Sequence, residues 1–369
     1  NNPDKLCKLV NVNRKGFMDN NFDNIVAGKD PETSYNNILQ NDLYEGNENY
    51  IRLSKEDENS ELTIILDKIK FGNEVLGNIC SVNNGVFSGC DTLNEKKKNK
   101  YNIDKNIGDG VFTITLNEYS QLLPLGKEKS IIKKLYKNSD IHKYWCNNKN
   151  ELYLINLRYT DRPNLDEYPK IKEHLLPYKE MLSDRPTTGT LESAFSKGYW
   201  YIMSTSRRVN MEKTKIVAPQ RSKTNTFGYN ECEWYAASDV FFITEPKQEY
   251  QLKYILSLLN SNLYYIWLYN KGKRKGEILE LIAKPLSEIP IKKADEQTQN
   301  KFVSIVDKIL AITQTEDYLQ NQEKQNAIKE YEKQINIMVY KLYDLTYDEV
   351  LTIDKDFRLS EQEYNEYQL

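Results

Sequence analysis

The chain has 369 residues, a formal net charge of −3 and a mean hydropathy of −0.72, so it is a polar chain long enough for two or three domains. No apolar run reaches the roughly 20 residues of a bilayer-spanning helix and no signal segment opens the chain, so we expect no membrane partner. Five scattered cysteines without a CxxC pair favour a reduced, cytoplasmic protein, and two histidines in all, His142 and His174, argue against a histidine-based catalytic or metal site.

Residues 1–61 are predicted to form a connector or the remnant of a preceding domain. They are rich in asparagine, and residues 42–61 carry seven acids against two bases. The chain begins at Asn1 without a methionine, which we interpret as the start of a fragment of a longer protein.

A second domain, residues 62–294, is predicted to mix helices with short strands. Apolar residues at helical spacing predict helices over 62–71, 165–183 and 249–269, the last broken near Asn260. Apolar runs bounded by turn residues predict strands at 112–124, 151–157, 199–203, 215–219, 234–237 and 239–244. The fold class is therefore α+β, with an irregular mixed β-sheet domain.

Two polar segments of this domain predict irregular structure. Asn83-Asn84-Gly85 is a strong turn signal, and Gly89 allows close approach of the backbone. The lysine-rich residues 95–100, EKKKNK, predict a solvated loop.

The third region, residues 295–369, is predicted to be helical. Apolar positions from Phe302 to Leu310 and again over 319–343 recur at helical spacing and are joined by a short polar turn, which is typical of an antiparallel helical hairpin. A last short helix, 347–353, follows Thr346 as N-cap with Glu349 at the capping-box position.

Charge is distributed as a basic middle between acidic ends. Residues 185–223 carry eight bases and two acids, whereas residues 344–369 carry eight acids and two bases. The chain has only 10 arginines among its 51 basic residues, yet seven of them lie between Arg158 and Arg274. The planar guanidinium suits bidentate bonding to phosphate or guanine, so this clustering favours an anionic partner over generic surface charge.

The sequence contains no convincing active site. Nucleotide-binding, nucleophile-elbow and zinc-protease motifs are all missing. Acid–x–Lys triplets such as Glu95-Lys96-Lys97 have no spaced carboxylate to complete a nuclease set, and they fit a solvated lysine cluster.

Three polar, cation-rich loops follow ordered elements in the middle third. The richest is the run of hydrogen-bond donors from Gln220 to Thr226, which leads into Phe227. Segments 185–189 and 204–208 repeat the combination of hydroxyl groups and arginine, and residues 271–275 add four more positive charges. The side chains of the three loops are of the kind that donates to phosphates and to base edges, whereas residues 271–275 are expected to contact the phosphate backbone, because clustered lysines supply charge without fixed geometry.

Several stretches, in order, resemble one family. These are LDKIKFGNEVLGNICSVNNGVFSGCDTL (66–93), YPKIKEHLLPYKEMLSDR (168–185), KIVAPQRSKTNTFGYNE (215–231), WYAASDVFFIT (234–244), LKYILSLLNSNLYYIWLY (252–269), KPLSEIPI (284–291) and QINIMVYKLYDLTYDEV (334–350). Together they resemble the C-terminal target-recognition region of TaqI-like and type IIG restriction–modification adenine-specific DNA methyltransferases. The resemblance covers roughly residues 62–350.

The resemblance implies that the longer protein methylates a flipped adenine with S-adenosylmethionine. The Asn/Asp-Pro-Pro-Tyr/Phe motif and the glycine-rich cofactor motif of that family are not found here, so we expect the methyltransferase domain upstream and no cofactor in this chain. The implied partners are duplex DNA and that upstream domain of the same protein.

From side-chain chemistry we assign Arg207, Arg208 and Arg221 to guanine or phosphate, and Gln220 and Asn225 to adenine. The complete set of predicted DNA-contacting residues is Arg185, Thr187, Thr188, Arg207, Arg208, Gln220, Arg221, Lys223, Asn225, Phe227, Lys271, Lys273, Arg274 and Lys275.

Three alternatives stay open at this point. A type I restriction specificity subunit would carry two recognition domains, whereas the motifs here describe one. A phage-defence interaction scaffold would use the acidic tail and helical hairpin and would not bind DNA. A nuclease with a site hidden in the irregular sheet would cleave DNA with a metal. Whether the longer protein also cleaves DNA is left open.

Overall fold

The computed structural model describes residues 5–12, 22–45, 50–51, 61–149, 151–186, 190–204 and 210–369. Contacts between Cα atoms divide the chain into two compact units, residues 1–64 and 65–369. The domain boundaries predicted from the sequence, 1–61, 62–294 and 295–369, stay predictions.

The first unit is built on one antiparallel pair of strands. β1 (Leu6–Val12) and β2 (Thr33–Leu39) align from Leu6 opposite Leu39 to Val12 opposite Thr33. Ile25 of the helix α1 (Phe22–Val26) and Ile38 of β2 are buried and supply its apolar contacts. The 3-10 helix η2 (Gln40–Leu43) leads to the short paired strands β3 (Tyr44–Glu45) and β4 (Tyr50–Ile51).

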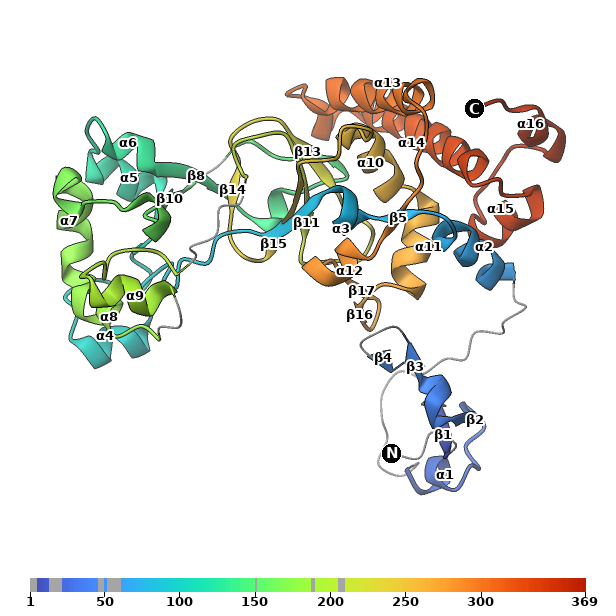
Figure 1. The fold of residues 1–369 in the computed structure, drawn as a ribbon, viewed down its shortest axis with the longest axis horizontal. Helices are drawn as coiled ribbons and strands as arrows, with labels where there is room; N and C mark the ends of the chain where they lie inside the picture. Colours follow the sequence, from blue (N-terminus) through green and yellow to red (C-terminus); the bar gives the residue numbers. More distant parts are fainter. Residues whose placement is uncertain are drawn as a thin grey trace. The chain divides into compact units, whose positions relative to one another are not determined.

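A five-stranded mixed sheet lies at the centre of the second unit, in the order β6-β15-β11-β13-β9 (Figure 1). Its strands are β6 (Ser81–Asn84), β9 (Tyr144–Trp145), β11 (Lys215–Pro219), β13 (Gly228–Asn230) and β15 (Val240–Thr244). Every residue of β11 and β15 is buried, which accounts for their continuous apolar runs. The strands predicted at 215–219 and 239–244 are confirmed.

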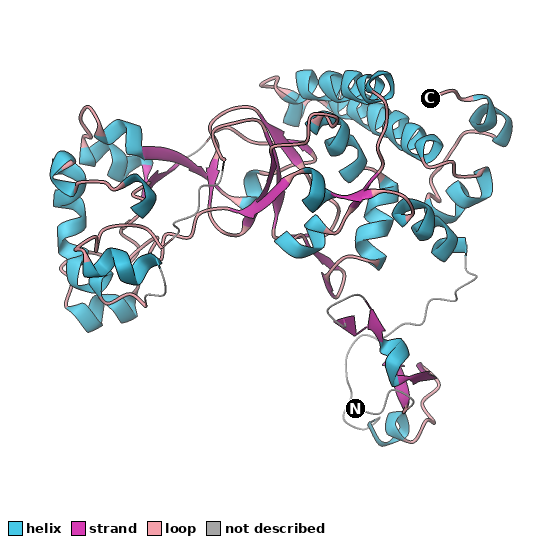
Figure 2. Ribbon diagram, viewed as in Figure 1, coloured by secondary structure: helices cyan, strands magenta, loops and turns pink. Residues whose placement is uncertain are grey.

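A second sheet has the order β14-β8-β10-β7 and carries most of the shorter helices. Its strands are β7 (Thr113–Thr115), β8 (Ile132–Tyr136), β10 (Leu152–Ile155) and β14 (Tyr235–Ala236). The helices, gathered beyond one end of β8 and β10 in Figures 1 and 2, are α4 (Glu95–Tyr101), α5 (Leu116–Leu122), α6 (Glu128–Ile131), α7 (Pro169–Leu175), α8 (Lys179–Ser183) and α9 (Thr190–Ser196). Short 3-10 helices connect these parts: η3 (Asn138–Asp140), η4 (Tyr159–Asp161), η5 (Leu165–Glu167) and η6 (Leu176–Tyr178).

The C-terminal part is helical, as predicted. Helices α13 (Glu296–Thr313) and α14 (Gln322–Leu342) pack as a hairpin around η7 (Tyr318–Gln320) and against α10 (Leu252–Leu259) and α11 (Asn262–Asn270). α15 (Tyr347–Ile353) begins with the predicted capping box of Thr346 and Glu349, and α16 (Glu361–Glu366) repeats the device. Further elements are α2 (Glu61–Lys70), β5 (Glu74–Val75), α3 (Leu76–Ile79), α12 (Ala283–Ser287) and β18 (Pro290–Ile291), together with a small sheet of three strands described below.

The predicted fold class, α+β with a C-terminal helical region, is confirmed, although the strands form several small sheets rather than one. Within the described part of the chain, no helix combines the length and the apolar character that crossing a bilayer requires.

Several local predictions are wrong or incomplete, among them the turn expected at Asn83-Asn84-Gly85, where Asn83 and Asn84 belong to strand β6 and pair with β15. The strand expected over 112–124 ends at Thr115, because Thr115 and Glu118 form a capping box that starts α5. The loop expected at 95–100 is the helix α4, capped by the side chain of Asn94. The helix expected over 165–183 is interrupted by η6, which contains Pro177.

The strand expected at 199–203 does not form. The backbone carbonyls of Trp200 and Ile202 accept hydrogen bonds from the guanidinium of Arg185, at 3.0 and 2.7 Å, instead of from a neighbouring strand. Buried carbonyls need a partner, and here an arginine takes the place of a sheet ladder.

Candidate nucleic-acid interface

A small three-stranded sheet brings two of the predicted basic segments together. β11 ends at Pro219, and the chain continues into β12 (Arg221–Ser222), which pairs with β17 (Ile278–Glu280). β17 also pairs with β16 (Arg274–Lys275), so the order is β12-β17-β16. We call these three strands the basic sheet.

The basic sheet presents several cations to solvent. Arg221, Lys273, Arg274 and Lys275 are all exposed, as is Lys223 in the loop that follows β12. The hairpin between β16 and β17 turns at Gly276, whose φ of +60° favours glycine. The fold therefore joins loops that are about 50 residues apart in the sequence into one cationic surface.

The carboxylate of Glu280 forms ion pairs with two of these cations. Glu280 Oε1 accepts a hydrogen bond from Arg221 Nε at 3.3 Å, and Glu280 Oε2 lies 3.1 Å from Lys273 Nζ. The hydrogen bond from Lys273 and the nearby Arg221 lower the pKa of Glu280, so the carboxylate is charged at neutral pH.

Arg274 is held by an aromatic ring. Its guanidinium carbon lies 3.8 Å from the centroid of Tyr269, and its Nη1 donates to the carbonyl of Gly276 at 3.2 Å. The Tyr269 hydroxyl donates to Glu277 Oε2 at 2.8 Å. A stacked arginine of this kind has less conformational freedom to lose on binding than a free lysine.

The loop after β12 is tied to the break between α10 and α11. Asn225 Nδ2 donates to the carbonyls of Leu259 and Ser261, at 2.7 and 2.8 Å. Asn260 clamps the next turn, because its Nδ2 donates to the Phe227 carbonyl at 2.8 Å and its Oδ1 accepts from the Phe227 amide at 3.0 Å. Asn225 and Phe227 are 4% and 0% exposed, so their predicted contact with DNA is corrected: they anchor the loop.

Arg185 is also an internal residue, which corrects the prediction that it contacts DNA. Its side chain donates to the carbonyls of Leu182, Ser88, Trp200 and Ile202 at 2.7 to 3.1 Å. Its guanidinium lies 5.4 and 5.3 Å from the rings of Phe112 and Phe195. Burial lowers the pKa of Arg185 to about 10, which leaves it charged at neutral pH.

The other predicted contacts have mixed outcomes. Thr187, Thr188, Arg207 and Arg208 lie outside the described residues. Gln220 and Lys271 are half-buried next to the basic sheet, with the Gln220 carbonyl accepting from the Leu281 amide at 2.9 Å. The structure thus brings Gln220, Arg221 and Lys223 together with residues 271–275 but does not bring Arg185 to them.

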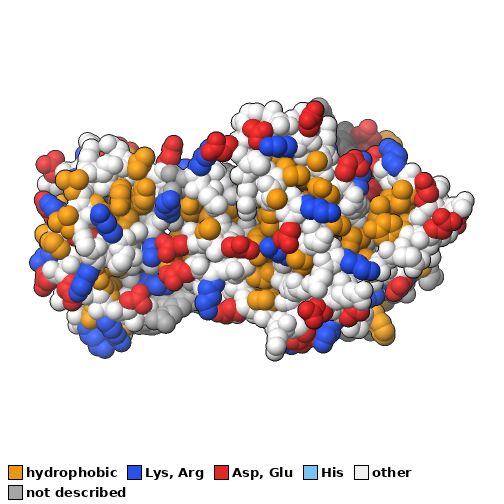
Figure 3. All heavy atoms as spheres, turned by 90° about the horizontal axis from the view of Figure 1, so that it is seen from above, with side chains coloured by type: hydrophobic (Ala, Val, Ile, Leu, Met, Phe, Trp, Pro, Cys, Tyr) orange, Lys and Arg blue, Asp and Glu red, His pale blue; other side chains and the backbone are white. Residues whose placement is uncertain are grey.

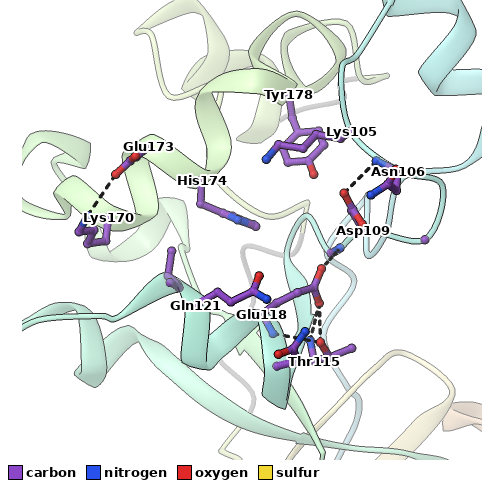
Figure 4. A pocket seen from close by; sticks show the side chains of 14 residues that line it. Lys105, Asn106, Asp109, Thr115, Glu118, Gln121, Lys170, Glu173, His174 and Tyr178 are labelled. Atoms are coloured by element: carbon purple, nitrogen blue, oxygen red, sulfur yellow. Dashed lines mark hydrogen bonds and ion pairs between the residues drawn. The ribbon is translucent and has the colours of Figure 1, made fainter.

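A separate polar pocket of about 670 Å³ lies among α5, α7 and the loop 105–110 (Figure 4). Its His174 contacts the Val111 carbonyl through Nε2 at 3.0 Å, and burial lowers the pKa of this histidine. Although burial opposes ionisation of Glu118, backbone hydrogen bonds from Thr115 and Gly110 lower its pKa. Both groups are thus engaged by the protein itself, and no cluster of metal-binding residues occurs in the described ranges.

The face that carries α13 and α14 differs from the basic sheet. Figure 3 views the molecule from this side and shows acidic and basic side chains interspersed. Ion pairs such as Lys253 with Asp307, at 2.8 Å, neutralise charge there. This face has no extended field of one sign that would attract a polyanion.

Two residues of the site, Glu280 and Asn260, are not predicted from the sequence. Glu280 lies in ILE, residues 278–280, too short a run to signal a strand partner for Arg221. The sequence predicts Asn260 only as the place where the helix over 249–269 is broken. A pair of asparagines at the break, Asn260 and Asn262, was the available signal, because asparagine binds backbone groups at turns and caps.

Residues 133–291 match the TaqI-like C-terminal specificity domain. The matched segment contains the whole basic sheet, Asn225 and Asn260. The chain is 22% identical over 248 residues to the Type II methyltransferase M.HindII of Haemophilus influenzae, with 64% of this chain and 42% of the relative covered. The chain therefore spans less than half the length of that relative.

The comparison with solved structures finds, among others, two restriction–modification enzymes. The type IIL restriction-modification enzyme MmeI, solved in complex with DNA, has a TM-score of 0.53 and 12% identity, with 80% of this chain and 37% of MmeI covered. The type IIG restriction endonuclease BpuSI has a TM-score of 0.41 and 12% identity, with 85% and 36% covered. At these identities the likeness to MmeI concerns the fold alone.

Proposed function

We propose that this chain is the sequence-specific duplex DNA recognition module of a type II or type IIG restriction–modification adenine methyltransferase. The observation that carries the proposal is the basic sheet, which joins Arg221 to Lys273, Arg274 and Lys275 inside the segment that matches a specificity domain. A short β-ribbon with exposed arginines fits the width of the major groove, where guanine offers two acceptors side by side.

The cations of the surface have different roles in this proposal. Arg221 and Arg274 are held by Glu280 and Tyr269, so they read base edges, which demands fixed geometry. Lys223 and Lys275 contact phosphates, because a flexible ammonium supplies charge without direction. Arg185, Asn225 and Phe227 support the loops from inside. Gln220, Thr187, Thr188, Arg207, Arg208 and Lys271 stay candidates for contact.

The longer protein is proposed to methylate adenine with S-adenosylmethionine bound in an upstream methyltransferase domain, in the cytoplasm. The support is the similarity to M.HindII together with the family resemblance of the sequence. No residue of this chain is assigned to the cofactor, since the sequence has neither the glycine-rich nor the Asn/Asp-Pro-Pro-Tyr/Phe motif.

The direct test selects preferred sequences from a random duplex library with the 369-residue chain. The selected duplex and an unrelated duplex are then titrated at several salt concentrations. We expect one short sequence to be enriched and bound at least about 1,000-fold more tightly than unrelated DNA. Absence of salt-dependent binding to any duplex would overturn the proposal and favour the interaction scaffold.

A further inference from the structure

The carboxylate of Glu280 is more enclosed than the cations it binds. Arg221 and Glu280 stand opposite each other in the β12–β17 pair, and the Glu280 amide also donates to the Lys273 carbonyl at 2.8 Å. The side chain of Glu280 is 12% exposed, whereas those of Arg221 and Lys273 are 57% and 52% exposed. The acid is therefore a fixed point from which the two cations extend into solvent.

The bond to Glu280 leaves Arg221 able to bind a further partner. A guanidinium has five N–H donors in one plane, and this bond uses the single donor on Nε. The two terminal amino groups form the edge that binds guanine O6 and N7. Holding Nε orients that edge before DNA arrives, which lowers the entropy cost of binding.

The charge of Glu280 has a separate consequence. It offsets part of the attraction that Arg221 and Lys273 exert on phosphates, and this attraction is the same for every sequence. Its loss should therefore raise affinity for all duplexes alike, whereas loss of the Nε contact should weaken binding to one sequence only. The two effects can be measured separately.

We infer that Glu280 is a positioning residue that sets the sequence selectivity of Arg221, an inference that rests on the proposed function. Glu280 holds the guanidinium plane in the orientation that matches one base pair. It also keeps the basic sheet from binding unrelated DNA as tightly as its full positive charge would allow.

Three substitutions of Glu280 separate orientation from charge. Glu280→Ala should raise affinity for an unrelated duplex about fivefold at low salt and lower the ratio of specific to non-specific affinity about tenfold. Glu280→Gln should give the same non-specific gain with a smaller loss of ratio, because its amide oxygen still accepts from Nε. Glu280→Asp keeps the charge but withdraws it from Nε, so the ratio should fall without a non-specific gain.

A matched control removes the same charge elsewhere. Asp307→Asn removes the charge of the α13 residue that pairs with Lys253 of α10, and Figure 1 draws α13 at the top of the molecule and β16 and β17 lower down. Asp307→Asn should leave the ratio of specific to non-specific affinity unchanged. Thermal unfolding of each variant monitors folding, and Glu280→Gln and Glu280→Asp preserve most of the side-chain volume.

The outcomes distinguish this inference from the proposed function. A wild-type chain that binds all duplexes equally would overturn both. If the wild-type chain is selective and its ratio of specific to non-specific affinity is unchanged by all three Glu280 substitutions, the positioning role alone is overturned. In an Arg221→Ala background, Glu280→Ala should no longer change the ratio, and a full tenfold loss there would show that Glu280 does not act through Arg221.

Discussion

Individual arginines of this chain serve opposite purposes. Arg185 is buried and bonds four backbone carbonyls, whereas Arg221 reaches solvent from an edge strand of a small sheet. Both follow an ordered element and stand beside hydroxyl residues, so the local sequence does not distinguish them. Only the tertiary fold, which places aromatic rings around Arg185, separates the supporting arginine from the exposed one.

Arg221 and Lys275 should respond differently to truncation. Arg221→Ala removes a directional contact and should cost about 1–3 kcal/mol on the selected duplex but much less on unrelated DNA. Lys275→Ala removes a phosphate contact, so it should weaken both complexes alike and reduce the salt slope by about one. Fluorescence anisotropy titrations at four salt concentrations measure both effects. Equal losses for the two variants on both duplexes would contradict the assignment.

Lys215 gives the protein a pH-dependent contribution to stability. It is fully buried at the start of β11 and donates to the Lys213 carbonyl at 2.7 Å, and burial lowers its pKa to about 8 from the usual 10.5. Between these pH values the unfolded chain keeps a proton that the folded chain has released, so rising pH favours folding through this group.

The test compares wild type with Lys215→Met, which cannot titrate. The free energy of unfolding of wild type minus that of the variant should increase between pH 8 and 10.5. Urea unfolding at pH 7.5 and 9.5 measures this difference, and the buried cysteines and tyrosines, common to both proteins, cancel. A difference that stays constant or falls would show that burial does not lower the pKa of Lys215 below its value in the unfolded chain.

Long apolar patterns predicted elements well. β11 and β15 were predicted from continuous apolar runs, and α10, α11, α13 and α14 from helical spacing, because burial of a whole face leaves a signal in the sequence. The basic sheet could not be predicted in this way. β12 and β17 are two and three residues long, and their partnership depends on how α10 and α11 place the intervening chain.

Short elements were missed because local hydrogen bonds decide them. The lysine-rich α4 begins at the Asn94 cap. Residues 199–203 form no strand, because the carbonyls of Trp200 and Ile202 accept hydrogen bonds from Arg185. Of the candidate site, Arg221, Lys223 and residues 273–275 are exposed, and their contact with DNA stays a prediction. Asn225 and Phe227 are buried instead, because a polar or aromatic side chain in a loop can face inward as well as outward.

The Asn260 clamp should stabilise both the fold and the recognition loop. Asn260→Ala leaves the buried amide of Phe227 without its partner, whereas the Phe227 carbonyl keeps the Tyr144 amide at 2.8 Å, so the variant should lower the free energy of unfolding by about 1–3 kcal/mol. Because the loop carries Lys223 and follows Arg221, the variant should also lose selectivity at temperatures where it is folded. Asn300→Ala, at an exposed position on α13, is the control and should change neither property.

At the scale of the whole molecule, the proposed function divides recognition and chemistry between parts of a longer protein. Residues 133–291 match a TaqI-like C-terminal specificity domain, a helical region follows this segment, and the chain spans 42% of the relative M.HindII. The interspersed charges on the α13–α14 face suit packing against protein better than binding a polyanion (Figure 3). A division of this kind requires that DNA contacts concentrate on the basic sheet.

Hydrogen exchange with and without the selected duplex tests this requirement most directly. Bound DNA shields backbone amides and slows local opening where it makes contact. We predict slower exchange in residues 220–226 and 271–280, and unchanged exchange in α13 and α14. Protection confined to α13 and α14, with 220–226 and 271–280 unaffected, would contradict the claim that the basic sheet is the DNA-reading surface.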